Sequence, residues 1–73
     1  MKVYVVMYEE MDEPSEILSI HKSVDTAIKA ALAVKNMMKD WKEQKGFNKN
    51  IIKYWGSRMG MKSIDVRMYE IQK

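Results

Sequence analysis

The segment KVYVVMYE at residues 2–9 most constrains the fold, because it is typical of a β-strand that is apolar on both faces. Side chains alternate between the two faces of a strand. One face would carry Val3, Val5 and Met7. The opposite face would carry Tyr4, Val6 and Tyr8. A sheet built on this strand therefore needs a cover on each face, since large apolar patches rarely stay in water.

A second strand is predicted at residues 16–22, EILSIHK, after a connection rich in Pro, Asp and Ser. We expect the two strands to pair antiparallel as a hairpin. Leu18 and Ile20 would then share the face of Val5, and Ile17 would lie on the other face with Ser19 and His21.

A helix is predicted from Val24 to about Gln44. Ser23 is a good N-cap, Asp25 lies in the first turn, and Gly46 is a suitable stop. At helical spacing one apolar arc contains Ala27, Ala30, Ala31, Val34, Met37, Met38 and Trp41. The alanines should let this helix approach the sheet closely.

A last strand is predicted at residues 63–72, SIDVRMYEIQ. Its core face would carry Ile64, Val66 and Met68, with Arg67, Tyr69 and Ile71 behind them. The expected fold is α+β, a small antiparallel three-stranded sheet packed on one long helix, in the order β-β-α-variable segment-β. Residues 1–73 would form a single domain.

The variable segment, 47–60, is the one remaining cover for the second sheet face. Phe47, Ile51, Tyr54 and Trp55 have the spacing of a short amphipathic helix, although Asn50 to Trp55 also fits an edge strand. We expect the second face to be covered by this segment, by another copy of the chain, or by both.

The charge of the chain is divided unevenly along its length. Residues 1–24 carry two lysines and five acids, whereas residues 45–62 carry five cations and no acid. Cations interleaved with aromatic residues favour contact with an acidic partner. The candidate partner-binding residues are Lys49, Lys53, Tyr54, Trp55, Arg58 and Lys62. The alternative is that the aromatic residues pack on the protein itself and the cations are solvated.

The residue types needed for most catalytic chemistry are missing or scattered. The chain has no cysteine and a single histidine, His21, and its three glycines match no phosphate-binding loop. The acidic run from Glu9 to Glu16 lacks the spacing of a calcium loop. We therefore expect no enzyme activity, no metal and no cofactor. Met59 and Met61 flank Gly60, where an exposed binding role is plausible.

The length of 73 residues gives a marginal core, and small domains often gain stability by oligomerisation. We expect a homodimer or higher oligomer. The sequence shows no signal peptide and no apolar run long enough to cross a bilayer, which predicts a cytoplasmic protein without membrane contact.

Three segments carry a resemblance to known proteins: KVYVV at 2–6, SVDTAIKAA at 23–31 and IDVRMYEI at 64–71. In these the chain resembles small uncharacterised phage and prophage accessory proteins of β-β-α-β order. The resemblance implies a viral protein that acts without catalysis, by binding a host or viral protein. The leading hypothesis is thus a non-enzymatic protein-binding module, such as a phage-encoded modulator of a host protein. The alternatives are a nucleic-acid-binding accessory protein that uses residues 45–62 and a homo-oligomeric structural protein.

Overall fold

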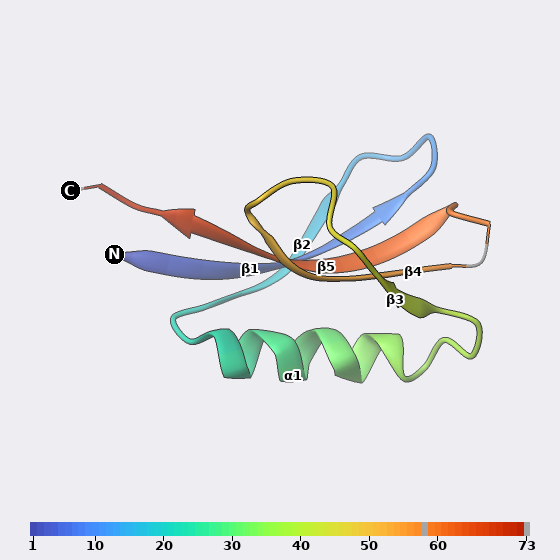
Figure 1. Ribbon diagram of the computed structural model, residues 1–73, viewed down its shortest axis with the longest axis horizontal. Coiled ribbons are helices and arrows are strands. Elements are labelled where there is room, and N and C mark those ends of the chain that lie inside the picture. Colours follow the sequence, from blue (N-terminus) through green and yellow to red (C-terminus); the bar gives the residue numbers. More distant parts are fainter. Residues whose placement is uncertain (58, 73) are drawn as a thin grey trace.

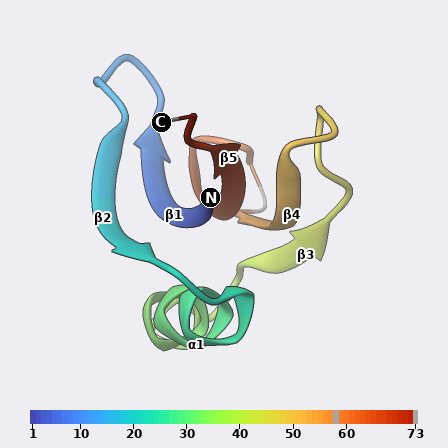
Figure 2. The same ribbon diagram turned by 90° about the vertical axis from the view of Figure 1, so that its left-hand side faces the viewer.

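The structure is a computed structural model that describes residues 1–57 and 59–72. Its elements are β1 (Lys2–Glu10), β2 (Glu16–His21), α1 (Val24–Lys35), β3 (Lys42–Gln44), β4 (Ile51–Gly56) and β5 (Lys62–Glu70). The strands form one antiparallel five-stranded sheet in the order β2-β1-β5-β4-β3, and α1 packs on one face of it (Figures 1 and 2). The predicted α+β class is confirmed, whereas the predicted number of three strands is wrong.

β1 and β5 form the centre of the sheet and pair along all nine residues of each strand, from Lys2 opposite Glu70 to Glu10 opposite Lys62. The two ends of the chain therefore lie side by side (Figure 1). The N–H of Ile71 donates to the carbonyl of Met1 at 2.7 Å. This ladder joins the most distant parts of the sequence, so β5 completes the fold.

α1 begins as predicted and ends early. The Ser23 side chain accepts a hydrogen bond from the Thr26 N–H at 3.4 Å, which satisfies one free donor of the first turn. The helix ends at Lys35, a cation placed favourably for the helix dipole. The prediction of a helix to Gln44 is wrong, because residues 42–44 pair with β4 instead.

Trp41 explains why the helical spacing of the apolar residues predicted too long a helix. The side chain is buried and stacks on Tyr8, with ring centroids 6.3 Å apart. To reach that position the chain must leave the helix and return to the sheet, and burying one indole removes a large apolar area from water. Tertiary packing thus overrides a helical pattern that continues through Met37 and Met38.

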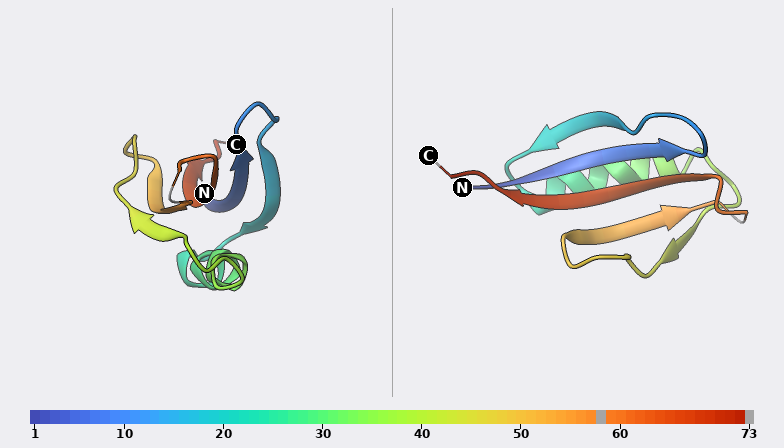
Figure 3. Two further views of the ribbon diagram at one scale, coloured as in Figure 1. Left: turned by 90° about the vertical axis from the view of Figure 1, so that its right-hand side faces the viewer. Right: turned by 90° about the horizontal axis from the view of Figure 1, so that it is seen from above.

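The core lies between α1 and the sheet. The buried residues of this cluster are Val6, Ala27, Ala31, Trp41, Trp55, Ile64 and Val66. The two alanines are small and let α1 pack closely on β1, β2 and β5, and the view from above shows the helix behind these strands (Figure 3). Trp41 and Trp55 extend the apolar layer beyond the helix toward β4 and β3.

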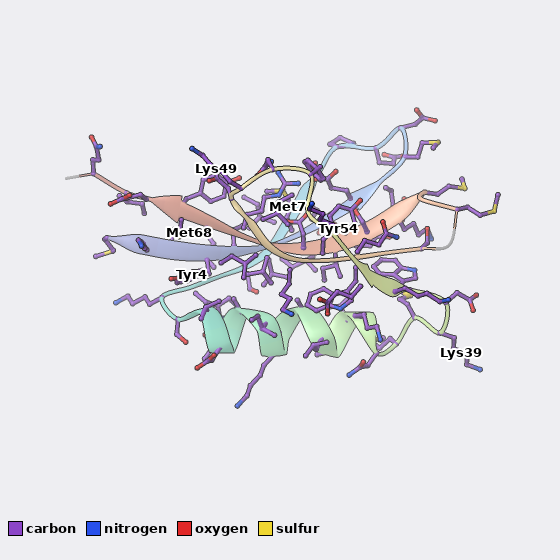
Figure 4. All side chains as sticks on the ribbon, viewed as in Figure 1. Tyr4, Met7, Lys39, Lys49, Tyr54 and Met68 are labelled. Carbon is purple, nitrogen blue, oxygen red and sulfur yellow. The ribbon has the colours of Figure 1, made fainter. Side chains whose placement is uncertain are left out.

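The sequence pattern assigns Val3, Val5 and Met7 to the core face of β1, and this prediction is wrong. Val6 pairs with Val66 and Tyr8 with Ile64, so Tyr4, Val6 and Tyr8 face the helix together with the core residues of β5. Tyr4 points toward α1 and Met7 away from it (Figure 4). Both faces of β1 are apolar, so its pattern alone does not choose between them; the register with β5 does.

The segment 47–60 is a strand and a turn, and the predicted amphipathic helix is wrong. The alternative of a strand at Asn50 to Trp55 is confirmed by β4, but its predicted edge position is wrong, because β4 pairs with β5 on one side and with β3 on the other. The connection from β3 to β4 rises on the side of the sheet that points away from α1, next to β4 (Figures 1 and 2). That loop carries Phe47, which therefore covers part of the second face, while Trp55 belongs to the core on the first.

Candidate binding surfaces

The six predicted partner-binding residues do not form one surface. Trp55 is 4% exposed, packed in the core on the helix side of β4. Tyr54 points to the opposite face, where its ring packs nearly perpendicular to that of Phe47, with the two ring centroids 5.7 Å apart. Successive side chains of a strand face opposite ways, so the pair of aromatic residues is split. Trp55 is not accessible to an incoming nucleic-acid base or protein surface.

The predicted cations are also spread out. Lys49 is exposed in the loop before β4, and Lys53 bonds Glu43 of β3 at 3.3 Å. Lys62 starts β5 and lies 3.7 Å from Glu10. Arg58 lies outside the described residues. Two of these lysines thus already have acidic neighbours, and such exposed pairs contribute only about 0–1 kcal/mol each.

A different site lies where the connection from α1 to β3 meets the turn from β4 to β5. We call it the methionine groove. It has a volume of about 420 Å³ and is lined by Met37, Met38, Lys39, Asp40, Trp41, Ser57, Met59, Met61 and Lys62. Met37 and Met59 are 77% and 80% exposed, and Met61 is 48% exposed. A buried indole thus lies beside a group of methionines that stand largely in water.

Local hydrogen bonds hold both walls of the methionine groove. On one wall the Met37 N–H donates to the Val34 carbonyl at 3.1 Å and the Met38 N–H to the Lys35 carbonyl at 2.9 Å. These bonds continue the end of α1 as tight turns and keep both side chains near Trp41.

On the other wall the Ser57 hydroxyl accepts from the N–H groups of Met61 and Lys62, each at 3.1 Å. The turn between β4 and β5 needs a residue in the left-handed region, and Gly60, with φ of 72°, fills it without strain. The backbone beneath Met59 and Met61 is therefore fixed, while their flexible side chains remain free to adapt.

The rim of the methionine groove is more basic than acidic. Of the described lining residues, Lys39 and Lys62 carry positive charge and Asp40 carries negative charge; Lys62 also lies 3.7 Å from Glu10. Lys39 projects from the end of the molecule into solvent (Figure 4). The groove thus combines adaptable methionine side chains with lysines at its rim.

The second sheet face holds a charged cluster at its centre. Asp65 is fully buried, and its carboxylate accepts two hydrogen bonds from the Arg67 guanidinium, at 2.8 and 3.2 Å. The same guanidinium bonds Glu9 of β1, and its carbon lies 5.6 Å from the centre of the Phe47 ring. Burial raises the pKa of the Asp65 carboxyl, and the hydrogen bond and charge of Arg67 oppose that rise.

This cluster has the contacts of a structural site. Every buried side-chain nitrogen and oxygen in the described part of the chain has a hydrogen-bond partner. Arg67 joins β5 to β1 and holds the Phe47 loop against the sheet. Among the described residues, no group of three or more histidines, aspartates or glutamates is arranged to hold a metal ion.

The sequence predicts a contact role for three of the nine residues that line the methionine groove, Met59, Met61 and Lys62. Met59 and Met61 were singled out because they flank Gly60, whereas Met37 and Met38 were assigned to the helix arc. The charged cluster was missed, because Asp65 alternates with apolar neighbours as any exposed strand residue would.

No helix in residues 1–57 and 59–72 is long and apolar enough to cross a membrane. Comparisons with protein-family models, curated proteins and solved structures find no match to this chain.

Proposed function

We propose that this protein is a non-enzymatic protein-binding module that holds a short segment of a partner protein in the methionine groove. The observation that carries the proposal is the exposure of Met37 and Met59, at 77% and 80%, beside the buried ring of Trp41. Apolar side chains left in water cost free energy that a partner's apolar side chain would recover, at about 25 cal/mol per Å² buried.

Methionine suits this role because its unbranched thioether adapts to partners of different shape. Its sulfur also makes favourable contacts with aromatic rings. A partner side chain such as Phe or Leu would enter between the two walls and rest near Trp41. The fixed backbone of the walls keeps the ordering cost of binding low.

The charge at the rim favours an acidic flank on the partner segment. Lys39 and Lys62 lie on the rim, and carboxylates beside the apolar anchors would meet them. Complementary charge chiefly raises the association rate and the specificity. The partner expected is thus a segment with two or more large apolar residues and adjacent Asp or Glu. A phage-encoded modulator of a host protein would use the groove in this way.

Selection from a displayed library of random peptides tests the proposal without a known partner. We expect enriched peptides to share large apolar residues flanked by Asp or Glu. These peptides should bind the Met37→Ser/Met59→Ser variant at least about tenfold more weakly, a loss of about 1.4 kcal/mol. Fluorescence anisotropy of a labelled peptide gives the dissociation constants.

The matched control is Ile71→Ser, which removes an exposed apolar side chain, 48% exposed, at the other end of β5. It should leave peptide binding unchanged. The proposal fails if no peptide is enriched, or if the enriched peptides bind the double variant as tightly as the native chain. Circular dichroism of both variants confirms that they are folded.

A further inference from the structure

The methionines of this chain gather at the methionine groove rather than in the buried core. Four of the eight methionines line the groove. Among the described residues, the buried core cluster contains no methionine. Met37, Met59 and Met61 are 77%, 80% and 48% exposed. Met7 and Met68 lie on the two central strands and are only partly exposed (Figure 4). The most accessible thioethers of the groove are thus the side chains that a bound peptide would contact.

A thioether reacts with a peroxide by taking up one oxygen atom. A lone pair of the sulfur attacks one oxygen of hydrogen peroxide and the O–O bond breaks. The departing hydroxide takes the proton of the transferred oxygen and leaves as water. The sulfur loses two electrons and the peroxide gains them, and the product is methionine sulfoxide. Because exposure favours this reaction, Met37 and Met59 are the groove side chains most open to it.

The sulfoxide changes what the groove can bind. Its S=O group is polar and hydrogen-bonds to water, so an apolar side chain that enters the groove must strip that water away at a cost in free energy. Met37 and Met59 belong to opposite walls, and both would present a polar group to the same ligand. Oxidation therefore turns an apolar contact surface into a polar one.

The walls of the groove do not depend on sulfur for their shape. One wall is fixed by backbone hydrogen bonds at the end of α1, and the other by the Ser57 hydroxyl. Met38 is the one groove methionine that packs partly against the core, and it is less exposed than the other three. Oxidation of the exposed side chains should thus alter binding and leave the fold intact.

We propose that Met37 and Met59 form a reversible oxidation site that controls the methionine groove, with peroxide as the substrate that modifies them. The inference rests on the proposed function, since the change acts on the peptide held in the groove. The reduced groove binds the apolar segment and the oxidised groove releases it. Methionine sulfoxide reductases restore the thioether, and two thiols supply the electrons and become a disulfide as the oxygen leaves as water.

Peptide mapping by mass spectrometry tests the site itself. The native chain is treated with increasing hydrogen peroxide, which catalase then removes. We expect one added oxygen atom at Met37 and at Met59 well before Met7 reacts. Met1 and Met11 are 61% and 57% exposed outside the groove, and they should react as well and serve as internal controls. Oxidation of Met7 as early as Met37 and Met59 would overturn the selectivity of the site.

Fluorescence anisotropy tests the effect on binding. The probe is a library-selected peptide without methionine, cysteine or tryptophan. We expect the oxidised native chain to bind it at least about tenfold more weakly. Treatment with methionine sulfoxide reductases and a dithiol should restore the original dissociation constant. The circular dichroism spectrum should stay unchanged throughout. Unchanged affinity after oxidation, a loss that reduction does not reverse, or an unfolded oxidised chain would each overturn the proposal.

Leucine variants separate the effect of sulfur from that of apolar surface. Met37→Leu/Met59→Leu/Met61→Leu keeps the groove apolar at similar volume and removes three thioethers. This variant should bind the peptide when untreated and keep its affinity after peroxide, although Met1 is still oxidised. The matched control Met11→Leu should lose affinity on oxidation as the native chain does. A triple variant that loses as much affinity as the native chain would show that these sulfurs are not the site.

The same binding measurement distinguishes the two proposals. If the untreated native chain binds no selected peptide, the proposed function fails and the control by oxidation fails with it. If the untreated chain binds and the oxidised chain binds equally well, the proposed function stands and the oxidation site is wrong.

Discussion

The two faces of the sheet are built differently. The face toward α1 has an apolar centre, from Val6, Ile64 and Val66 against the alanines of the helix to Trp41 and Trp55 beyond it. The face away from α1 has a charged pair, Asp65 and Arg67, at its centre. On that face apolar side chains such as Ile20 stand exposed at the edge.

The difference follows from what covers each face. A helix with small residues offers a broad apolar surface, so the first face can be filled with large side chains. The second face is covered inside the chain by one short loop with a single aromatic ring, Phe47, which is itself 64% exposed. A loop of this size cannot bury a wide patch, and the polar centre needs no wide cover because its groups bond each other. The first face therefore holds most of the buried apolar core, whereas the second keeps apolar side chains exposed beside a buried charged pair.

Truncation on the first face should have the largest effect. Trp55→Ala removes an indole that is 4% exposed, and we expect a loss of about 3–5 kcal/mol in the free energy of unfolding. In a chain this small that loss can unfold the protein. Urea denaturation followed by circular dichroism measures it.

The comparison on the second face is Phe47→Ala, which should cost about 1 kcal/mol or less, since that ring is mostly in water and its contacts with Tyr54 and Arg67 are partly exposed. Equal losses in the free energy of unfolding for Trp55→Ala and Phe47→Ala would show that the two faces contribute equally to stability.

Breaking the charged pair should have the next largest effect. Arg67→Met leaves the carboxylate of Asp65 buried without its main partner, and we expect a loss of about 3 kcal/mol. The double variant Asp65→Leu/Arg67→Met removes both charges and should recover most of that loss. A double variant as unstable as Arg67→Met would show that the pair acts through more than its charges. Urea denaturation at neutral pH measures all three chains.

Prediction from the sequence succeeded where local chemistry decides the structure. The N-cap at Ser23, the strand at 2–9 and the hairpin to Ile20 each depend on neighbouring residues, and all three are present. It failed where distant pairing decides. Residues 42–44 have no strand pattern of their own and become β3 because they meet β4.

The candidate site shows the same division. The glycine between Met59 and Met61 marks a turn, so the exposure of those two side chains is predictable from the sequence. Met37 joins them only because α1 ends at Lys35 and the chain turns back, which the helical spacing conceals. The burial of Asp65 cannot be predicted from the sequence. Its partner Arg67 is two residues away, and such a pair is common on exposed strands.

The last prediction concerns pH and the first face. The Tyr8 hydroxyl donates to the Glu10 carboxylate at 2.6 Å. This hydrogen bond, with burial and the negative charges of Glu10 and Glu16, raises the pKa of Tyr8 from 10.0 to about 12. Because the folded chain holds the proton more tightly than the unfolded chain, Tyr8 adds stability that is fully present below pH 10 and is lost between pH 10 and about 12.

The free energy of unfolding of the native chain should therefore fall more steeply over that range than that of Tyr8→Phe. The two chains differ only in the hydroxyl of residue 8, so the difference between their profiles isolates the contribution of Tyr8. Parallel profiles would show that Tyr8 ionises equally in both states and that the bond to Glu10 adds no stability. Tyr4→Phe is the matched control, since Tyr4 lies on the same face and strand and its profile should follow that of the native chain. A steeper fall that depends on Tyr8 alone would place a pH-sensitive contact beside Trp41, on the face that otherwise depends only on apolar packing.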